Sequence, residues 1–529
     1  MIRMLLPILP VVAMCLPMLR AQPAPESVVV LYNARIPDSR KLAEHYQKVR
    51  MIPEENLVGL EMPAGPDISR DEYEETILKP LRRQFDVRGW WSRGVDSGGI
   101  TLPKAGRMHV LVSMKGVPLR IKQSPLPAGE TPAPPDKDPF KGHDEASVDS
   151  ELAMFGVEGL PTEGVLQNKY YKSELPINAA RMPFLILTAR IDAVSYATCR
   201  RMIDDAFETE SRGLWGMTYV DIANKFPQGD KWLEAVAKQS IEAGFPTVVD
   251  RFNDTFPKNY PMGDVAVYFG WYEWNVNGPF LYPGFRFRKG AVAAHLHSFS
   301  AMQMNDASKN WSAALLERGA AVTIGNVWEP YLHLTHDFEI LHRRLLAGDT
   351  WVEACWKAMP VTSWQGVVLG DPLYRPFLHL DGSGKVVDED RDYRALRAAR
   401  LRWPEDGVER RQQLTAAVER TRSPVLAEAL ALDALADGLT SRASGEFTKV
   451  RQLYVRTEDK MRQDFHRIGI DRAAGRKSEA IRDLRDAQRL YGPVPAAQSL
   501  DAWLKILDPP PPPPNPAAPP GGKKPGTAN

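Results

Sequence analysis

Short apolar runs alternate with amphipathic helical patterns along the first two-thirds of the 529-residue chain. Runs such as "VVVLYN" and "VAVYFG" are typical of strands buried on both faces, and apolar residues recur at helical spacing in many of the segments between such runs. A strand followed by a helix and another strand forms a parallel pair whose helix covers the sheet. The alternation therefore predicts an α/β fold with two tandem, three-layer parallel-sheet units, over residues 23–213 and 214–382.

Strand-like runs end near residue 389, and charged amphipathic helical patterns follow one another to residue 508. Because their apolar stripes must pack on one another, we expect an all-α, repeat-like domain over residues 383–508. The final segment begins "DPPPPPPNPAAPP". Proline has no N–H to donate and favours an extended chain, so residues 509–529 are predicted to be a disordered tail that acts as a spacer or anchor.

The N-terminal segment has the layout of a signal peptide over residues 1–22. A basic start is followed by a short apolar stretch and then by small residues near Ala21. This predicts export to the periplasm, the outer surface or the extracellular space. The stretch is short and contains three prolines, and no later run is apolar enough to span a bilayer, so the mature chain is expected to have no transmembrane segment.

Charge and cysteine content exclude some functions. The formal net charge of +1 gives no electrostatic reason to expect nucleic acid as a partner. After removal of the signal peptide the cysteines are Cys199 and Cys355, which both lie in helical patterns. We expect them to be buried as small apolar residues, and the sequence leaves open whether they pair.

Two groups of charged residues have a predicted structural role. Asp149, Glu151, Arg190 and Asp192 are expected to form a buried polar cluster that joins loops to the sheet, since charges at that depth must be matched. Asp371 in "LGDPLYRPF" is expected to fix the turn around the last strand.

Several motifs follow one another over residues 27–380, among them "VVVLYN", "MHVLVSMKGVPLRI", "LTARIDAVSYATCRR" and "VVLGDPLYRPF". Their order resembles that of the gingipain-type cysteine peptidases, whose catalytic unit has the caspase-like fold. The chain is also similar to a group of secreted bacterial proteins of unknown function that lack the Cys/His dyad.

The resemblance implies a catalytic histidine in a Gly-His-Gly turn at one strand end and a cysteine at the end of the next strand. In such a dyad the imidazole accepts the thiol proton. Here the first turn reads Gly270-Trp271-Tyr272, and the second strand is followed by His297-Ser298. Because indole has no basic nitrogen, the resemblance implies a conserved scaffold with a degenerate peptidase site.

Aromatic residues gather at the expected strand ends. Trp271, Tyr272 and Trp274 follow one predicted strand, and Trp328 follows another. Aromatic rings stack on sugars and on extended peptides. The first function hypothesis is therefore a non-catalytic pocket at the sheet rim that binds a peptide, protein or glycan-like ligand.

A hydrolase is the second hypothesis. Ser298 would be the nucleophile and His295 or His333 the base, oriented by Glu273 or Glu329. The two glutamates could also form an acid/base pair if both lie on the carboxyl rim of the sheet.

A metal-dependent variant uses His295 and His297. Residues two apart on a strand project from one face, which is a spacing found in zinc sites, and the third ligand would be Glu273, Glu329 or His333. The alternative is that one histidine is packed and the other caps a loop. No other cofactor is predicted. A third hypothesis is an envelope scaffold that acts through the helical domain.

Overall fold

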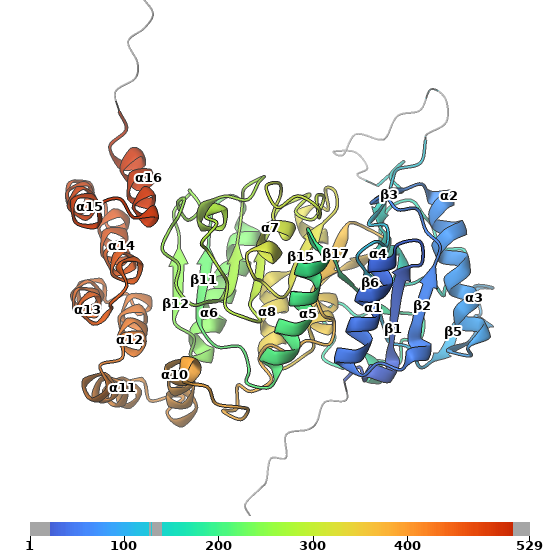
Figure 1. Ribbon diagram of the computed structural model, residues 1–529, viewed down its shortest axis with the longest axis horizontal. Coiled ribbons are helices and arrows are strands. Elements are labelled where there is room, and N and C mark those ends of the chain that lie inside the picture. Colours follow the sequence, from blue (N-terminus) through green and yellow to red (C-terminus); the bar gives the residue numbers. More distant parts are fainter. Residues whose placement is uncertain (1–21, 126–128, 130–139, 511–529) are drawn as a thin grey trace, which may run out of the picture.

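The computed structural model describes residues 22–125, 129 and 140–510 of the chain (Figure 1). The predicted signal peptide up to residue 21 and the predicted tail from residue 511 lie outside the described residues. The described chain is a mixed α/β region with parallel sheets, followed by a stretch of helices. The predicted α/β class and the change to helices near residue 389 are confirmed.

Six strands form the first sheet, in the order β15-β17-β10-β6-β1-β2. Neighbouring strands are parallel except that β15 is antiparallel to β17. The strands are β1 (Val28–Asn33), β2 (Leu57–Leu60), β6 (Val110–Met114), β10 (Leu187–Ile191), β15 (Thr323–Asn326) and β17 (Gly366–Leu369).

Both faces of this sheet are covered, which explains why β1 is apolar from Val28 to Leu31. Val30 packs in one hydrophobic core with Leu42 of helix α1. Val29 and Leu31 point the other way, into a second core that contains Phe85 of helix α3. Successive residues of a strand face opposite sides, so a strand between two helical layers needs apolar residues at every position.

The helices of the α/β region are α1 (Pro37–Arg50), α2 (Arg70–Tyr73), α3 (Lys79–Val87), α4 (Val148–Leu152), α5 (Tyr196–Glu210), α6 (Pro227–Ala243), α7 (Ser312–Glu317), α8 (Phe338–Leu346) and α9 (Trp351–Ala358).

Four parallel strands form the second sheet, in the order β12-β11-β13-β14. Short strands add three small sheets over or beside the first one: β3-β7-β8, β4-β5 and β9-β16. The strands are β11 (Met217–Asp221), β12 (Thr247–Asp250), β13 (Val265–Gly270), β14 (Val292–His295), β3 (Asp67–Ile68), β7 (Arg120–Ile121), β8 (Ala146–Ser147), β4 (Trp91–Val95), β5 (Thr101–Gly106), β9 (Leu166–Gln167) and β16 (Val361–Thr362).

The two large sheets meet along β14 and β15. Val292 forms a parallel bridge with Val322, just before β15 begins. The N–H of Ala293 donates to the carbonyl of Val322 at 3.2 Å. The second sheet therefore continues into the first.

The predicted boundary at residue 213 does not separate two self-contained sheets. Strands β15 and β17 follow that boundary in the chain, but β17 pairs with β10 of the N-terminal unit. The division into sequential units is corrected in this respect. Local periodicity locates the strands, whereas the neighbour of each strand depends on contacts between distant segments.

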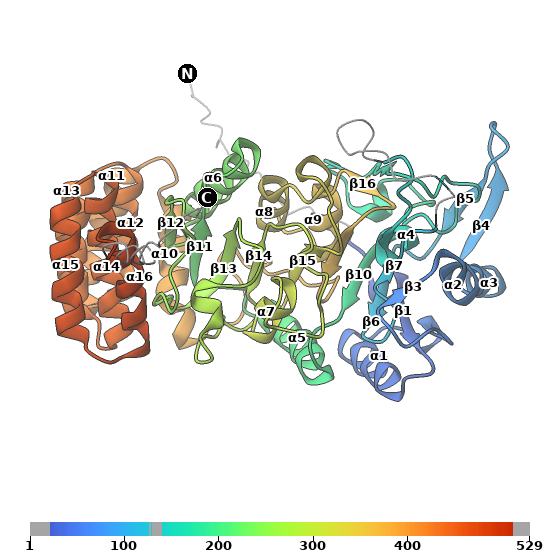
Figure 2. The same cartoon turned by 90° about the horizontal axis from the view of Figure 1, so that it is seen from above.

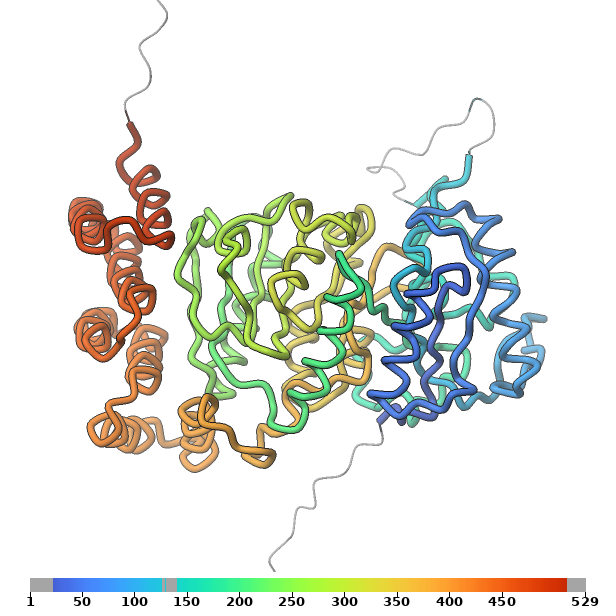
Figure 3. Tube along the Cα trace, viewed as in Figure 1, coloured from blue at the N-terminus to red at the C-terminus, as the bar shows by residue number. Residues whose placement is uncertain are grey.

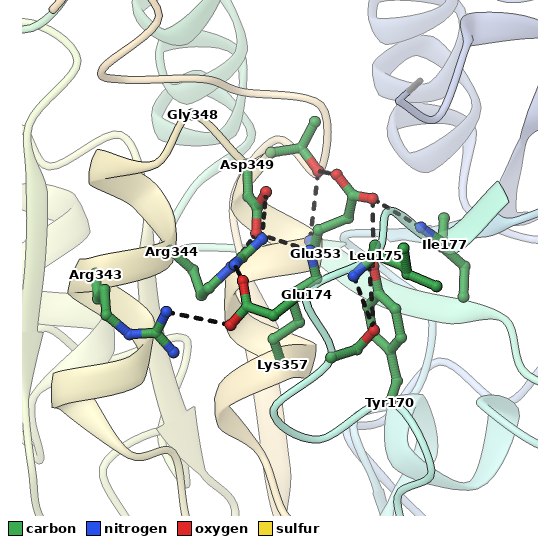
Figure 4. A network of polar contacts seen from close by, with 12 residues as sticks. Tyr170, Glu174, Leu175, Ile177, Arg343, Arg344, Gly348, Asp349, Glu353 and Lys357 are labelled. Atoms are coloured by element: carbon green, nitrogen blue, oxygen red, sulfur yellow. Dashed lines mark hydrogen bonds and ion pairs between the residues drawn. The ribbon is translucent and has the colours of Figure 1, made fainter. Parts of the chain in front are cut away.

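A buried polar network joins α8 and α9 to the segment before β10 (Figure 4). Asp349 accepts hydrogen bonds from Arg344 Nε at 2.6 Å and from Lys357 Nζ at 2.8 Å. Glu353 accepts from the backbone N–H of Ile177 at 3.0 Å. Burial lowers the pKa of Lys357, which is opposed by the charge of Asp349. The network thus holds together parts of the chain that are far apart in sequence.

The predicted polar cluster is present with one change. Arg190 Nε donates to Asp149 at 2.7 Å, Nη1 lies 3.3 Å from Asp192, and Arg190 is fully buried. Glu151 instead pairs with Arg70 at 3.1 Å. The predicted turn residue Asp371 is buried and accepts hydrogen bonds from two α1 side chains, Tyr46 Oη at 2.8 Å and Arg50 Nε at 2.5 Å.

The C-terminal helices form two rows beside β12 (Figure 2). The row of α12, α14 and α16 lies nearer to the sheet, and α13 and α15 lie farther out. Figure 3 traces the chain from β1 at one end of the molecule to these helices at the other. The helices are α10 (Arg391–Arg402), α11 (Gly407–Thr421), α12 (Pro424–Ala436), α13 (Thr440–Leu453), α14 (Thr457–Ala473), α15 (Lys477–Tyr491) and α16 (Gln498–Leu507). None of the helices in the described part of the chain is both long and apolar enough to cross a membrane.

The helical region is tied to the α/β region by a hydrogen bond from a buried arginine and by an aromatic contact. Arg462 of α14 donates two hydrogen bonds to Glu428 of α12, at 2.8 and 2.7 Å, and one to the carbonyl of Pro261 at 3.4 Å. The ring centroids of Tyr260 and Phe465 lie 5.1 Å apart. The loop between β12 and β13 is therefore the docking surface for α14.

Candidate functional site: the carboxyl ends of β13 and β14

The ends of β13 and β14 lie side by side. Gly270 is paired with His295 in the parallel register, and the N–H of Leu296 donates to the carbonyl of Gly270 at 2.7 Å. The segments that follow, 271–274 and 296–299, therefore lie against each other. The sequence predicts that these two strand ends are neighbours, and in the structure they are.

Trp271 fills a space inside the protein. Its ring is 1 % exposed, and Nε1 donates to Asp230 Oδ1 at 2.9 Å. A Cβ on Gly229 of α6 would overlap the indole, so the ring occupies the space left by that glycine. Trp271 therefore cannot face a ligand, and its predicted role as a ligand-binding residue is wrong.

The neighbouring aromatics form a row over the strand ends, which we call the aromatic row: Tyr272, His297, Trp274 and Phe299. Ring centroids lie 4.8 Å apart for Tyr272 and His297, 5.1 Å for His297 and Trp274, and 5.1 Å for Trp274 and Phe299. Trp274 is 50 % exposed. An exposed indole supported by packed rings is a surface on which a planar or apolar ligand group can stack.

His295 is held in the neutral form by its neighbours. Its Nε2 accepts a hydrogen bond from the N–H of Glu273 at 3.3 Å, so Nδ1 carries the proton and donates to Tyr268 Oη at 2.9 Å. The ring stacks on Trp311 with centroids 3.4 Å apart. Burial lowers the pKa of His295 well below its usual value. Because both ring nitrogens are engaged, His295 is a packed residue and is neither a free base nor a free metal ligand.

His297 and Ser298 do not form a catalytic pair. His297 Nδ1 bonds the backbone carbonyl of Ser298, and burial lowers the pKa of the imidazole. Within residues 22–125, 129 and 140–510, no histidine or carboxylate hydrogen-bonds the Ser298 hydroxyl. The predicted Ser–His–Glu arrangement is therefore not assembled in this structure.

The predicted carboxylates lie on the surface. Glu273 is exposed, and its carbonyl accepts from Trp311 Nε1 at 2.7 Å. Glu329 is exposed and accepts from the N–H of Tyr331 at 3.0 Å. His333 is exposed and its ring stacks on Tyr331 with centroids 6.3 Å apart. Glu273, Glu329 and His333 are therefore exposed residues, and their contacts in the described part of the chain do not bring them together as an acid/base pair or a ligand set.

The proposed zinc ligands are not brought together. His295 and His297 are separated by their different partners, since one stacks on Trp311 and the other on Tyr272. Among the described residues, no group of three or more His, Cys, Asp or Glu side chains is placed to hold a metal ion.

A cavity of about 470 Å³ lies beside the aromatic row, and we call it the rim cavity. Phe299 belongs to both, and Trp328, Tyr331 and Trp364 complete the aromatic walls. Trp328 is the predicted ligand-binding residue that lines this cavity. Trp364 is buried, with Nε1 donating to the carbonyl of Pro330 at 2.9 Å, so that wall is rigid.

The polar side of the rim cavity comes from residues on either side of a proline-rich stretch that has no strand or helix periodicity. His143 Nδ1 lies 2.9 Å from Glu145 Oε1, and both residues line the cavity with Lys122. In the part of the chain that the structure describes, Glu145 Oε2 is buried and has no hydrogen-bond partner. The charged sequence "GHDE" at the end of the proline-rich stretch was the signal that could have found this pair.

A second cavity, of about 250 Å³, lies at the carboxyl ends of β1, β6 and β10, and we call it the crevice. Ligands of open α/β sheets bind at such strand ends where the strand order reverses, and here β1 has β2 on one side and β6 on the other. Arg120 lines the crevice, and its guanidinium lies 5.7 Å from the ring centroid of Trp328 in the rim cavity.

The rim cavity and the crevice share two walls. Segment 119–123 supplies Arg120 to the crevice and Lys122 to the rim cavity. Segment 299–305 supplies Met302 to the crevice and Phe299 to the rim cavity. Arg120 Nη1 donates to the carbonyl of Met302 at 2.7 Å, which links the two walls.

The predicted cysteines lie away from this site. Cys199 is on α5 and Cys355 on α9, and both are buried and unpaired with each other. Burial raises the pKa of both thiols. Buried thiols with raised pKa values are inert, so neither is a candidate nucleophile.

A scan against protein-family models found no match to this chain, and neither curated proteins nor solved structures gave a significant match.

Proposed function

We propose that the chain is an exported, gingipain-like protein with a degenerate cysteine-peptidase site that binds a peptide or glycan-like ligand at the rim cavity. The observation that carries the proposal is the geometry at the two strand ends. A buried indole occupies the turn where the resemblance implies a histidine, and three half-buried aromatic rings and one buried indole line the neighbouring cavity. These features favour recognition over bond cleavage.

The contacts of the two histidines at these strand ends support a binding role. His295 has both nitrogens engaged, and His297 bonds the carbonyl of Ser298. A general base must lie within hydrogen-bond reach of the group it deprotonates. The Ser298 hydrolase and the zinc enzyme therefore have less support than binding.

The shared walls of the rim cavity and the crevice favour an extended ligand. A chain molecule could stack one unit on Trp328 and pass along Arg120 toward the crevice. Aromatic walls with a few polar groups are typical of sites for oligosaccharides and extended peptides.

The test is a binding screen of the full chain on arrays of oligosaccharides and of short peptides, followed by titration of the hits. Trp328→Ala should weaken the hit by about fivefold, since an aromatic contact contributes roughly 1 kcal/mol. Trp403→Ala is the matched control, because Trp403 is half-buried in the remote helical region. Equal affinity of the Trp328→Ala variant and the wild type would remove the rim cavity as the site, and cleavage of the bound ligand in mass spectra would remove the non-catalytic role.

A further inference from the structure

A separate cavity of about 660 Å³ lies between β12 and the C-terminal helices, and we call it the seam cavity. Its aromatic walls come from both sides. The loop after β12 supplies Phe252, Phe256 and Tyr260, while α14 and α16 supply Phe465 and Trp503. The cavity is thus built by the docking of the helices on the α/β region.

Two buried carboxyl groups lie at the strand ends beside the seam cavity. Asp250, the last residue of β12, lines the cavity and is 6 % exposed. Asp221, the last residue of β11, is 1 % exposed and is the register partner of Asp250. Register partners on parallel strands project from the same face, so the two side chains are neighbours.

Each carboxyl group has one oxygen with a partner and one without. Asp250 Oδ1 accepts from the N–H of Phe252 at 2.9 Å, and Asp221 Oδ2 accepts from the N–H of Phe256 at 3.1 Å. Asp250 Oδ2 and Asp221 Oδ1 are buried and have no hydrogen-bond partner among the described residues. A buried acceptor without a donor is costly, and native proteins rarely leave two together.

The cations that face this pair are already paired with other carboxylates. The other titratable groups that interact electrostatically with Asp221 or Asp250 are Tyr268, Asp254 and Glu273. The cations and their partners, with distances, are Arg472 with Asp254 at 2.7 Å and Arg251 with Glu234 at 2.7 Å. His466 also lines the cavity; its Nε2 lies 3.2 Å from Glu428, and burial lowers the pKa of the imidazole. Within the described chain, neither Asp221 nor Asp250 has an ion-pair partner.

We propose that the seam cavity binds a small organic ammonium compound, whose N–H groups donate to the open oxygen of Asp250 and whose apolar part packs on the aromatic walls. Asp221 lies behind Asp250 as its register partner. An ammonium group supplies both the donors and the positive charge that the pair lacks. Aromatic faces attract cations, and Arg472 lies over the Phe252 ring at 3.8 Å in this same cavity. A metal ion fits less well, because a third donor side chain is missing from the described residues.

Protonation of Asp250 should oppose binding. Burial raises the pKa of Asp250 to about 7, with Asp254 adding to the shift. Below that pH the carboxyl group is neutral, and an incoming ammonium group must displace its proton. Affinity should therefore increase as pH rises through 7.

The experiment compares n-butylammonium with n-butanol as probes of the full chain, by calorimetric titration and by thermal shift at pH 6 and pH 8. The two probes have nearly the same size, and only the first is charged. We expect binding of n-butylammonium alone, with about tenfold higher affinity at pH 8, since a carboxyl group with a pKa of about 7 is about ten times more ionised there.

Asp250→Asn should abolish both the binding and its pH dependence, and Asp71→Asn, at an exposed site on α2, should change neither. The wild-type comparison stands even if the Asp250→Asn variant fails to fold. Equal responses to the two probes, no response to n-butylammonium at pH 8, or retained binding by folded Asp250→Asn protein would each overturn the proposal. The first two results would mean that the two carboxyl groups share a proton as a structural pair.

Discussion

The rings of Tyr272 and His297 pack with centroids 4.8 Å apart, and they come from the carboxyl ends of two neighbouring parallel strands. Neighbouring strand ends of this kind can bring a base and a nucleophile together. Here they bring two rings together, and the imidazole is turned to the backbone carbonyl of Ser298. The same geometry thus supports a packed surface beside the rim cavity.

Replacing Trp271 with alanine should destabilise the fold, although the residue lies where a catalytic group would be expected. The side chain is 1 % exposed, and truncation of a buried tryptophan costs about 3–5 kcal/mol. Urea unfolding measures the change. Trp274→Ala is the control, because its side chain is 50 % exposed and should cost less than about 1 kcal/mol. Similar losses for the two variants would show that Trp271 is not a core residue.

Gly229→Ala should destabilise the protein because its Cβ would overlap the Trp271 ring. Overpacking of this kind typically costs about 1–3 kcal/mol. Gly445→Ala is the matched helical control: a Cβ there meets nothing within 4 Å, so the change should be neutral or stabilising by about 0.5–1 kcal/mol. In a Trp271→Ala background the cost of Gly229→Ala should fall, which a double-mutant cycle measures. An unchanged cost in that background would contradict the contact.

The strands of the two large sheets could be predicted from the sequence because each is marked by a local pattern. The run "VAVYFG" gave β13, and its parallel neighbour β14 placed His295 beside Gly270. Local patterns do not reveal which strands pair over long distances. The return of β17 to β10 was missed for that reason.

Side-chain roles were harder to predict because they depend on distant partners. Trp271 packs against Gly229 of α6, and burial keeps His295 neutral where it bonds Tyr268. The pair of His143 and Glu145 was missed because it follows a proline-rich stretch that has no helical or strand periodicity. Periodicity reports burial of one face, whereas a polar pair in a loop leaves no periodic signal.

Thiol-directed reagents should not modify the native protein. Cys199 and Cys355 are 0 % exposed, and burial raises the pKa of each thiol. The thiolate is the reactive form, so alkylation by iodoacetamide at pH 8 should be slow in the folded state and fast in guanidinium chloride. Mass spectrometry of the two samples checks this. Rapid alkylation of either residue in the native protein would show that the helices open locally.

Lys357→Ala should cost much more stability than removal of a surface lysine. Lys357 is buried and donates to Asp349 at 2.8 Å. Asp349 keeps its pair with Arg344, so the loss is that of one buried charge-assisted hydrogen bond, which typically costs about 1.5–3 kcal/mol. Lys309→Ala is the control, since its pair with Asp306 is exposed and contributes less than about 1 kcal/mol. Unfolding midpoints in urea measure both. A cost for Lys357→Ala as small as that of the control would show that the network in Figure 4 does not stabilise the fold.

Asp250 should make the folded protein less stable as pH rises from about 4 to 7. Burial raises its pKa from 3.8 to about 7, so the folded state holds a proton that the unfolded state has already released. The stability that a raised pKa contributes is complete at pH values below the pKa of the unfolded state, and it is lost as pH rises through the pKa of the folded state. For Asp250 this shift corresponds to a change in the free energy of unfolding on the order of a few kcal/mol.

Asp250→Asn removes that titration, so the variant should match the wild type near pH 4 and be more stable than it at pH 8, in the absence of any ligand. Urea unfolding of the two proteins at both pH values gives the comparison, with Asp71→Asn as the exposed control. If the free energies of unfolding of the wild type and the Asp250→Asn variant differ by the same amount at both pH values, burial does not shift the titration of this carboxyl group into the range from pH 4 to pH 8. The pKa of Asp250 would then be the same in the folded and unfolded states.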